Sequence, residues 1–150
     1  MVIVYIGIGS NLGNREENCE SAIRLLTEHG ITVTKRSSMI ETEPWGVKEQ
    51  PKFINMAVEV ETGLGPEELL HLLKKIEAAI GRRPTTHWGP RVIDLDILLY
   101  DDLVLKTPRL EIPHPGIIMR DFVLKPLAEI APDKIHPVLN KSIKSLLSDL

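Results

Sequence analysis

Two aspartates separated by one leucine are the strongest chemical signal in the sequence. Asp94 and Asp96 lie in the apolar run 92–100, VIDLDILLY, which is typical of a β-strand. Side chains two positions apart on a strand point to the same face, so both carboxylates project together. Like charges this close repel unless a cation or hydrogen-bond donors lie between them. Oxygen ligands suit Mg²⁺, which keeps several waters and shares phosphate oxygens with a substrate.

Arginines are concentrated around this pair, and they suit a compact polyanion held beside the metal. The stretch 82–120 contains Arg82, Arg83, Arg91, Arg109 and Arg120. A solvated surface with exposed salt bridges would have the same spacing, and two surface aspartates would have the same D-x-D pattern. The spacing alone leaves both interpretations open.

Two other patterns carry less chemical information. The segment 7–13, GIGSNLG, lies between a strand and a helix, but Leu12 stands where a dinucleotide-binding turn has its third glycine. We interpret the segment as a tight turn and a helix start. No histidine falls in a zinc-binding spacing. His114, within the sequence PHP, is either structural or part of the arginine-rich site.

Length and composition narrow the class of protein. A chain of 150 residues fits one domain spanning 1–150. Cys19 is the only cysteine, which excludes an internal disulfide framework and is compatible with the reducing cytoplasm. The net charge of −3 gives no support to nucleic-acid binding. The apolar N-terminus is too short to span a bilayer, so we expect no membrane partner.

Hydrophobic periodicity predicts an α+β fold. Strands are predicted at residues 2–9, 31–40, 52–62 and 92–100. One helix begins at Asn14, which forms a capping box with Glu17, and ends near Gly30; a second runs from Pro66 to Gly81. The order β-α-β-β-α-β predicts a ferredoxin-like core, with two helices on one face of a mostly antiparallel sheet. A C-terminal extension carries short helical patterns at 121–130 and 142–149.

The strand faces predict which side chains meet. In the run 52–62, Phe53 and Asn55 are expected on the face away from the helices. An aromatic beside an amide suits a flat heterocycle, although an amide on a strand can also be a plain hydrogen-bond partner. In the run 92–100 the helix face is predicted to carry Ile93, Leu95, Ile97 and Leu99. The aspartate face is predicted to carry Val92, Leu98 and Tyr100.

Several longer segments carry a family resemblance. The most specific is WGPRVIDLDI at 88–97. Others are GSNLG at 9–13, TEPWG at 42–46, the segment 50–55, GR at 81–82, RL at 109–110, PHP at 113–115 and the segment 120–127. Together these segments resemble the 6-hydroxymethyl-7,8-dihydropterin pyrophosphokinase family along essentially the whole chain.

The resemblance implies an ATP-dependent transfer of a pyrophosphoryl group to the pterin hydroxymethyl oxygen in folate synthesis, with release of AMP. It implies two Mg²⁺ ions bound by Asp94 and Asp96, with Arg82 and Arg91 as further catalytic residues. The implied ATP contacts are Glu77, Trp88, Arg91, Ile97, Arg109, His114 and Arg120. The implied pterin contacts are Thr42, Pro44, Trp45, Phe53, Asn55 and Phe122, with the ring stacked between the two phenylalanines.

Three positions depart from the family pattern, namely Lys74, Arg83 and Pro115, and they bear on nucleotide affinity more than on reaction type. Two other functions remain open at this stage. A ferredoxin-like regulatory module would explain the fold and Asn55 but not the aspartates and arginines together. A two-metal nuclease or nucleotidyl transferase would explain the aspartates, but the net charge disfavours it. Other folate-pathway enzymes are possible partners.

Overall fold

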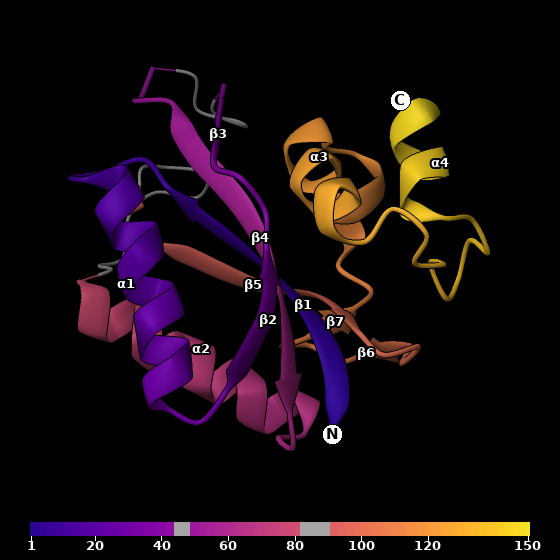
Figure 1. Ribbon diagram of the computed structural model, residues 1–150, viewed down its shortest axis with the longest axis horizontal. Coiled ribbons are helices and arrows are strands. Elements are labelled where there is room, and N and C mark those ends of the chain that lie inside the picture. The colour runs from indigo at the N-terminus through magenta and orange to yellow at the C-terminus, as the bar shows by residue number, and fades with distance from the viewer. Residues whose placement is uncertain (44–48, 82–90) are drawn as a thin grey trace.

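A five-stranded antiparallel sheet forms the centre of the computed structural model, which describes residues 1–43, 49–81 and 91–150 (Figure 1). The strand order is β2-β4-β1-β5, and β3 pairs with β4. The strands are β1 (Val2–Ser10), β2 (Thr32–Arg36), β3 (Ile40–Thr42), β4 (Phe53–Thr62) and β5 (Asp94–Tyr100). All four strand pairings are antiparallel, and this order matches the predicted ferredoxin-like core.

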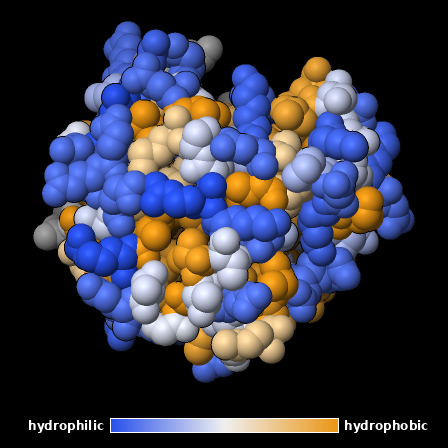
Figure 2. Space-filling model, in the orientation of Figure 1, coloured by the Kyte–Doolittle hydropathy of each residue, from blue (hydrophilic) through white to orange (hydrophobic). Residues whose placement is uncertain are grey.

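Two capped helices cover one face of the sheet, α1 (Arg15–Glu28) and α2 (Pro66–Ile80). The Asn14 side chain accepts a hydrogen bond from the backbone N–H of Glu17, and its amide donates to the Glu17 carboxylate. In α2, Pro66 occupies the first turn, and Gly81 ends the helix with a left-handed φ of 118°. Hydrophilic side chains predominate over α1 on the face seen in Figure 2, as expected for a helix with one buried stripe.

The apolar core is divided between the two faces of the sheet. Ile54, Met56, Val58 and Val60 point from β4 into the cluster shared with α1 and α2, as their alternation predicts. Ala57 belongs to a second cluster, which α3 (Asp121–Ile130) and α4 (Ile143–Ser148) complete on the opposite face. The extension is therefore a third layer that covers part of the sheet (Figure 1).

The predicted strand 31–40 is wrong in its continuity, because β2 ends at Arg36 and β3 begins at Ile40. Side-chain contacts at Ser37 and Ser38 explain the break. The Ser37 hydroxyl accepts from the Ala57 N–H at 2.9 Å. The N–H and hydroxyl of Ser38 both donate to the carboxylate of Glu129 in α3, at 2.9 and 2.8 Å. The Ser37 N–H still donates to the Ala57 carbonyl at 2.9 Å, so the chain leaves β4 only after Ser37, where the bonds of Ser38 turn it toward α3.

A bulge in β5 overturns two of the predicted side-chain directions. Tyr5 of β1 lies opposite Leu99, whereas its neighbour Ile6 lies opposite Ile97, so Leu98 is an extra residue. Because side chains alternate along a strand, one extra residue inverts every direction after it. Leu99 consequently packs in the α3 cluster and Tyr100 in the α1–α2 cluster, opposite to the prediction. The strand also starts at Asp94 rather than at residue 92.

Short elements connect β5 to α3. A hairpin of β6 (Leu105–Lys106) and β7 (Glu111–Ile112) is followed by a 3-10 helix at Pro115–Ile118. The 3-10 helix brings His114 and the start of α3 next to β5, since the His114 N–H donates to the Leu98 carbonyl at 3.0 Å. Within residues 1–43, 49–81 and 91–150, no helix is long and apolar enough to cross a membrane.

Candidate active site

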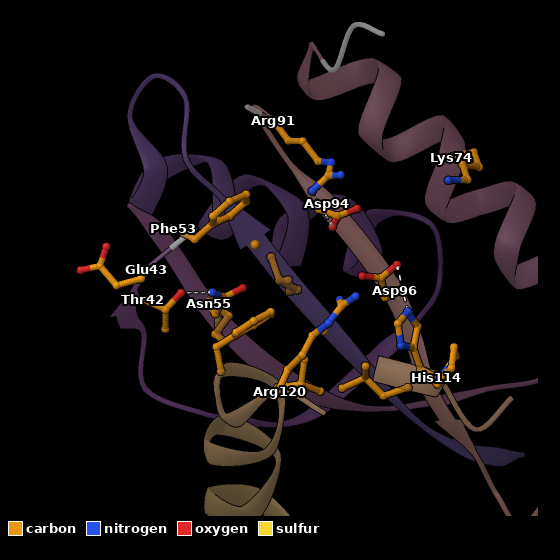
Figure 3. A pocket seen from close by; sticks show the side chains of 18 residues that line it. Thr42, Glu43, Phe53, Asn55, Lys74, Arg91, Asp94, Asp96, His114 and Arg120 are labelled. Atoms are coloured by element: carbon orange, nitrogen blue, oxygen red, sulfur yellow. Dashed lines mark hydrogen bonds and ion pairs between the residues drawn. The ribbon is translucent and has the colours of Figure 1, made fainter. Parts of the chain in front are cut away.

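A cavity of about 420 Å³ lies on the sheet face that α3 leaves partly open (Figure 3). Side chains from β4, β5, the 3-10 helix and the start of α3 form its walls. The predicted site residues that line it are Thr42, Phe53, Asn55, Arg91, Asp94, Asp96, His114, Arg120 and Phe122. The tertiary structure therefore gathers residues that are far apart in sequence into one hollow.

Two glycines of β1 form the floor of this cavity. Gly9 pairs with Asn55 on one side and with Asp94 on the other. A Cβ at Gly9 would approach Asn55 Oδ1 to 2.8 Å, so a side chain there would push the amide aside. Gly7 lies in the same way between Ala57 and Asp96. Both glycines fall at the end of the predicted strand 2–9 and in the predicted turn 7–13, and neither prediction included this role, although glycines inside an apolar strand signal a close approach of another group.

One end of the cavity is aromatic and carries an amide. The Phe53 and Phe122 side chains line it from β4 and from the first turn of α3. The Asn55 amide donates to Thr42 Oγ1 at 2.6 Å, which fixes the orientation of its carbonyl oxygen. The Arg120 guanidinium carbon lies 5.7 Å from the centroid of the Phe122 ring. Pro44 and Trp45, also predicted here, lie outside the described residues.

The other end of the cavity is charged. Asp94 and Asp96 share one face of β5, as predicted, with side chains 28% and 43% exposed. Arg91 Nη1 lies 3.9 Å from an Asp94 carboxylate oxygen, and His114 Nε2 lies 3.9 Å from one of Asp96 (Figure 3). Arg82 and Trp88, predicted to complete this end, lie outside the described residues.

Burial sets the charge state of the His114 imidazole. Burial is the main cause that lowers its pKa below the usual value, and the positive charge of Arg120 lowers it further. The negative charges of Asp94 and Glu111 oppose this shift only in part. Nδ1 accepts the Gly116 N–H at 2.9 Å, so the neutral ring carries its proton on Nε2, which faces Asp96.

The Arg120 guanidinium is also partly desolvated. Burial lowers its pKa, and the neighbouring carboxylates of Asp96 and Asp94 raise it. An arginine stays protonated under such shifts, because its ordinary pKa lies far above neutrality. The cavity therefore holds a fixed positive charge between its aromatic end and its carboxylate end.

Three of the predicted ATP contacts do not line the cavity. The Glu77 side chain is 3% exposed and accepts from the Leu95 N–H at 2.8 Å. Ile97 points into the α1–α2 cluster. Arg109 is 72% exposed and lies 3.6 Å from Glu67. Their nucleotide contacts stay predictions. Lys74, one of the departures from the family pattern, does line the cavity.

The donor set suits a hard divalent cation bound jointly with a substrate. No group of three histidine, cysteine, aspartate or glutamate side chains converges to hold a metal within the described residues. Asp94 and Asp96 offer carboxylate oxygens from one strand face instead. Mg²⁺ is commonly held by one or two carboxylates together with waters and substrate phosphates, so these residues fit it.

A family model described as 7,8-dihydro-6-hydroxymethylpterin-pyrophosphokinase (HPPK) matches residues 5–132. The chain belongs to the HPPK family. This membership confirms the resemblance drawn from the sequence motifs, and with it the prediction that the chain is a pterin pyrophosphokinase. The matched region contains every predicted site residue.

Relatives in other organisms cover most of the HPPK chain. The 2-amino-4-hydroxy-6-hydroxymethyldihydropteridine pyrophosphokinase of Bacillus subtilis is 50% identical over 129 residues, which are 85% of this chain and 77% of the relative. The enzyme of the same name from Aquifex aeolicus is 44% identical over 144 residues, 96% of this chain and 89% of the relative.

A solved structure has the same fold. The Plasmodium falciparum HPPK-DHPS crystal structure with pteroate superposes with a TM-score of 0.80 at 17% identity. The match covers 99% of this chain but only 42% of the Plasmodium chain. At this identity the likeness supports the predicted α+β fold alone.

Proposed function

We propose that this HPPK-family chain transfers a pyrophosphoryl group from ATP to the hydroxymethyl oxygen of 6-hydroxymethyl-7,8-dihydropterin in the cavity between β4, β5 and α3. The observation that carries the proposal is that one cavity joins an aromatic, amide-bearing end to a carboxylate pair flanked by arginines. A flat heterocycle fits the first end, and a metal-bound triphosphate fits the second. The hydroxymethyl oxygen attacks the β-phosphorus and loses its proton to solvent, the bond between that phosphorus and the α,β-bridging oxygen breaks, and AMP leaves with the electron pair of that bond.

The carboxylate end is the proposed Mg²⁺ site, with Asp94 and Asp96 as ligands and two ions expected. When bound, Mg²⁺ neutralises charge on the phosphate oxygens and draws electron density from the attacked phosphorus. Asp94 and Asp96 project from β5, an edge strand whose pairing with β1 holds the separation of the two carboxylates fixed. A rigid pair is useful because misplacement of about 1 Å at a reacting centre can cost on the order of 100-fold in rate.

The basic residues at the cavity are the proposed contacts of the phosphates. Arg91 and Arg120 present guanidinium groups, which can form paired hydrogen bonds to phosphate oxygens. The neutral His114 ring offers its Nε2–H as a further donor near Asp96. Arg82, Trp88, Glu77, Ile97 and Arg109 stay in the proposal as ATP-side residues on the strength of the family resemblance.

The aromatic end is the proposed pterin site. Phe53 and Phe122 would sandwich the ring, and such stacking contributes about 1–3 kcal/mol per flat base. The Asn55 carbonyl oxygen would accept from the ring N–H or amino group, because the bond from the Asn55 amide nitrogen to Thr42 orients this oxygen toward the cavity. Pro44 and Trp45 belong to the same proposed site by resemblance. Rigid holding of the ring would place the hydroxymethyl oxygen in line with the phosphorus.

The proposal also covers the domain organisation, the cellular location and the partners of the chain. The chain is proposed to act as a single domain in the cytoplasm, which the buried free thiol of Cys19 supports. Other folate-pathway enzymes are proposed as partners, and the fused HPPK-DHPS chain of Plasmodium falciparum supports such an arrangement.

The deciding experiment incubates the protein with ATP, Mg²⁺ and the hydroxymethyl dihydropterin and identifies the nucleotide product. AMP supports the proposal, whereas ADP would indicate an ordinary kinase. Pterin binding without turnover would favour a regulatory module. Cleavage of added DNA or RNA would favour the two-metal nuclease.

The metal assignment has its own test. Asp94→Asn and Asp96→Asn keep the side-chain shape and remove the charge, so each should lower kcat by several orders of magnitude while the unfolding transition stays close to that of the wild type. Asp133→Asn is the matched control, because Asp133 is exposed, lies 3.4 Å from Lys144 and does not line the cavity. A near-wild-type kcat in either active-site variant would contradict the assignment.

A further inference from the structure

Asn11, at the C-terminal end of β1, does not line the cavity but contacts two segments that lead into it. Its side chain is buried, with the residue 1% exposed. Its Oδ1 accepts the backbone N–H of Arg91 at 2.7 Å, and its own N–H donates to the Arg91 carbonyl at 3.0 Å. The pair of bonds clamps the Arg91 backbone from both sides. Arg91 lies just before β5, which begins at Asp94 and also carries Asp96.

The other end of the same amide contacts the segment before β4. Asn11 Nδ2 donates to Gln50 Oε1 at 2.8 Å and to the Pro51 carbonyl at 2.9 Å. The orientation of the amide is unambiguous, since a backbone N–H can only donate and a carbonyl can only accept. Both hydrogens and the oxygen of the amide are therefore used at once, which no hydroxyl, carboxylate or apolar side chain of similar size can reproduce.

We propose that Asn11 is a positioning residue for the transfer reaction, acting through the backbone of Arg91. The inference rests on the proposed function, in which the Arg91 guanidinium binds phosphate beside Asp94. That guanidinium is 17% exposed and lies 3.9 Å from the Asp94 carboxylate. Its reach is set by where its backbone is fixed. The Asn11 clamp fixes that backbone relative to the sheet, because the two Asn11 groups that form it, Oδ1 and the backbone N–H, directly follow β1.

A merely structural role would lower stability and leave the chemistry alone, so the test must separate the two. Asn11→Ala removes all three side-chain hydrogen bonds. Ser37→Ala is the matched control, since Ser37 is also buried and also bonds a backbone N–H, that of Ala57, but lines no part of the cavity. The free energy of unfolding of each variant is measured by urea titration, and kcat by AMP release.

A double-mutant cycle tests whether Asn11 affects kcat through Arg91. Asn11→Ala is expected to lower kcat at least tenfold in the wild-type background and less than twofold in an Arg91→Ala background, because the group that it positions is then gone. Ser37→Ala is expected to stay within twofold of the wild type in both. Equal losses from Asn11→Ala in the two backgrounds, or no loss in the wild type, would overturn the inference.

Amide hydrogen exchange gives a readout that needs no activity. The Arg91 N–H should exchange at least tenfold faster in Asn11→Ala than in Ser37→Ala, with the Leu95 N–H, held by Glu77, as the internal reference. Unchanged Arg91 exchange would contradict the clamp.

Absence of AMP from the wild type would instead contradict the proposed function, and exchange would still decide whether Asn11 holds Arg91. If Asn11→Ala does not fold, Asn11→Ser takes its place in both experiments.

Discussion

Gly9 and Asn55 lie directly opposite each other on β1 and β4, and the missing side chain of the glycine makes room for the amide of the asparagine. A Cβ on Gly9 would stand 2.8 Å from Asn55 Oδ1, closer than carbon and oxygen normally approach. The oxygen concerned is the one that the hydrogen bond to Thr42 turns into the cavity. The glycine on β1 therefore allows the Asn55 side-chain oxygen on β4 to face the cavity.

Gly9→Ala should weaken pterin binding while the fold persists. The added methyl group must displace the Asn55 amide, which costs the bond to Thr42 and the proposed contact with the pterin. We expect the KM for the pterin to rise about tenfold or more, which corresponds to one lost hydrogen bond at a buried group. The KM for ATP should change little. Steady-state kinetics with each substrate varied in turn measure both values.

Gly63→Ala provides the control for this substitution. A Cβ at Gly63 would make an ordinary contact with Met1 Sδ at 3.7 Å and lies away from the cavity. Its kinetic constants should match those of the wild type. Equal pterin KM values for Gly9→Ala and Gly63→Ala would contradict the role of Asn55.

Phe122→Ala should affect both ends of the cavity. The ring is a proposed stacking partner of the pterin, and the Arg120 guanidinium lies over it. Loss of stacking should raise the pterin KM about tenfold or more, and loss of support for Arg120 should also lower kcat. Phe122→Tyr keeps the ring and should retain most of the activity. A variant with normal kcat and raised pterin KM would show that the ring does not position Arg120.

Metal removal should abolish turnover without unfolding the protein. The proposed ligands lie on β5 of the central sheet, which the apolar core holds in place whether or not an ion is bound. Dialysis against EDTA should therefore stop AMP release, and added Mg²⁺ should restore it. The thermal midpoint without nucleotide should be the same before and after dialysis. A lowered midpoint would indicate a structural metal elsewhere.

His136 should make stability fall in mild acid. Burial lowers the pKa of this imidazole, and its Nδ1 accepts from the N–H groups of Val138 and Leu139, so the folded state holds it neutral. Between the usual pKa of about 6.5 and the lowered folded value, the unfolded chain binds the extra proton. The contribution of neutral His136 to the free energy of unfolding is therefore complete above about pH 6.5 and is lost as the pH falls through that window.

His136→Asn separates this effect from other titrations. The asparagine oxygen can accept in place of Nδ1 and cannot ionise. Urea unfolding at pH 7.5 and 5.5 should show a smaller loss of stability in the variant than in the wild type. His114, whose pKa is also lowered, contributes equally to both proteins and cancels in the comparison. Identical losses would show that His136 does not titrate in this range.

Local sequence patterns located the four strand regions, the two long helices and the shared face of Asp94 and Asp96, although the region 31–40 divides into β2 and β3. These are local properties, because alternation of apolar residues, an N-cap asparagine and a C-terminal glycine act within a few positions along the chain. The long motif around the aspartates also identified the family. Such features require no knowledge of which strand lies beside which.

The remaining features of the fold and the site depend on contacts between distant segments of the chain. The bulge at Leu98 arises from pairing with β1 and cannot be seen in the alternation of β5. The break between β2 and β3 depends on Glu129, 91 positions from Ser38. The role of Gly9 depends on its neighbour across the sheet. The Asn11 side chain bonds to Gln50 and Arg91, which lie 39 and 80 positions away along the chain. Hydrogen bonds and steric fit act through space, so the distance along the chain gives no sign of them.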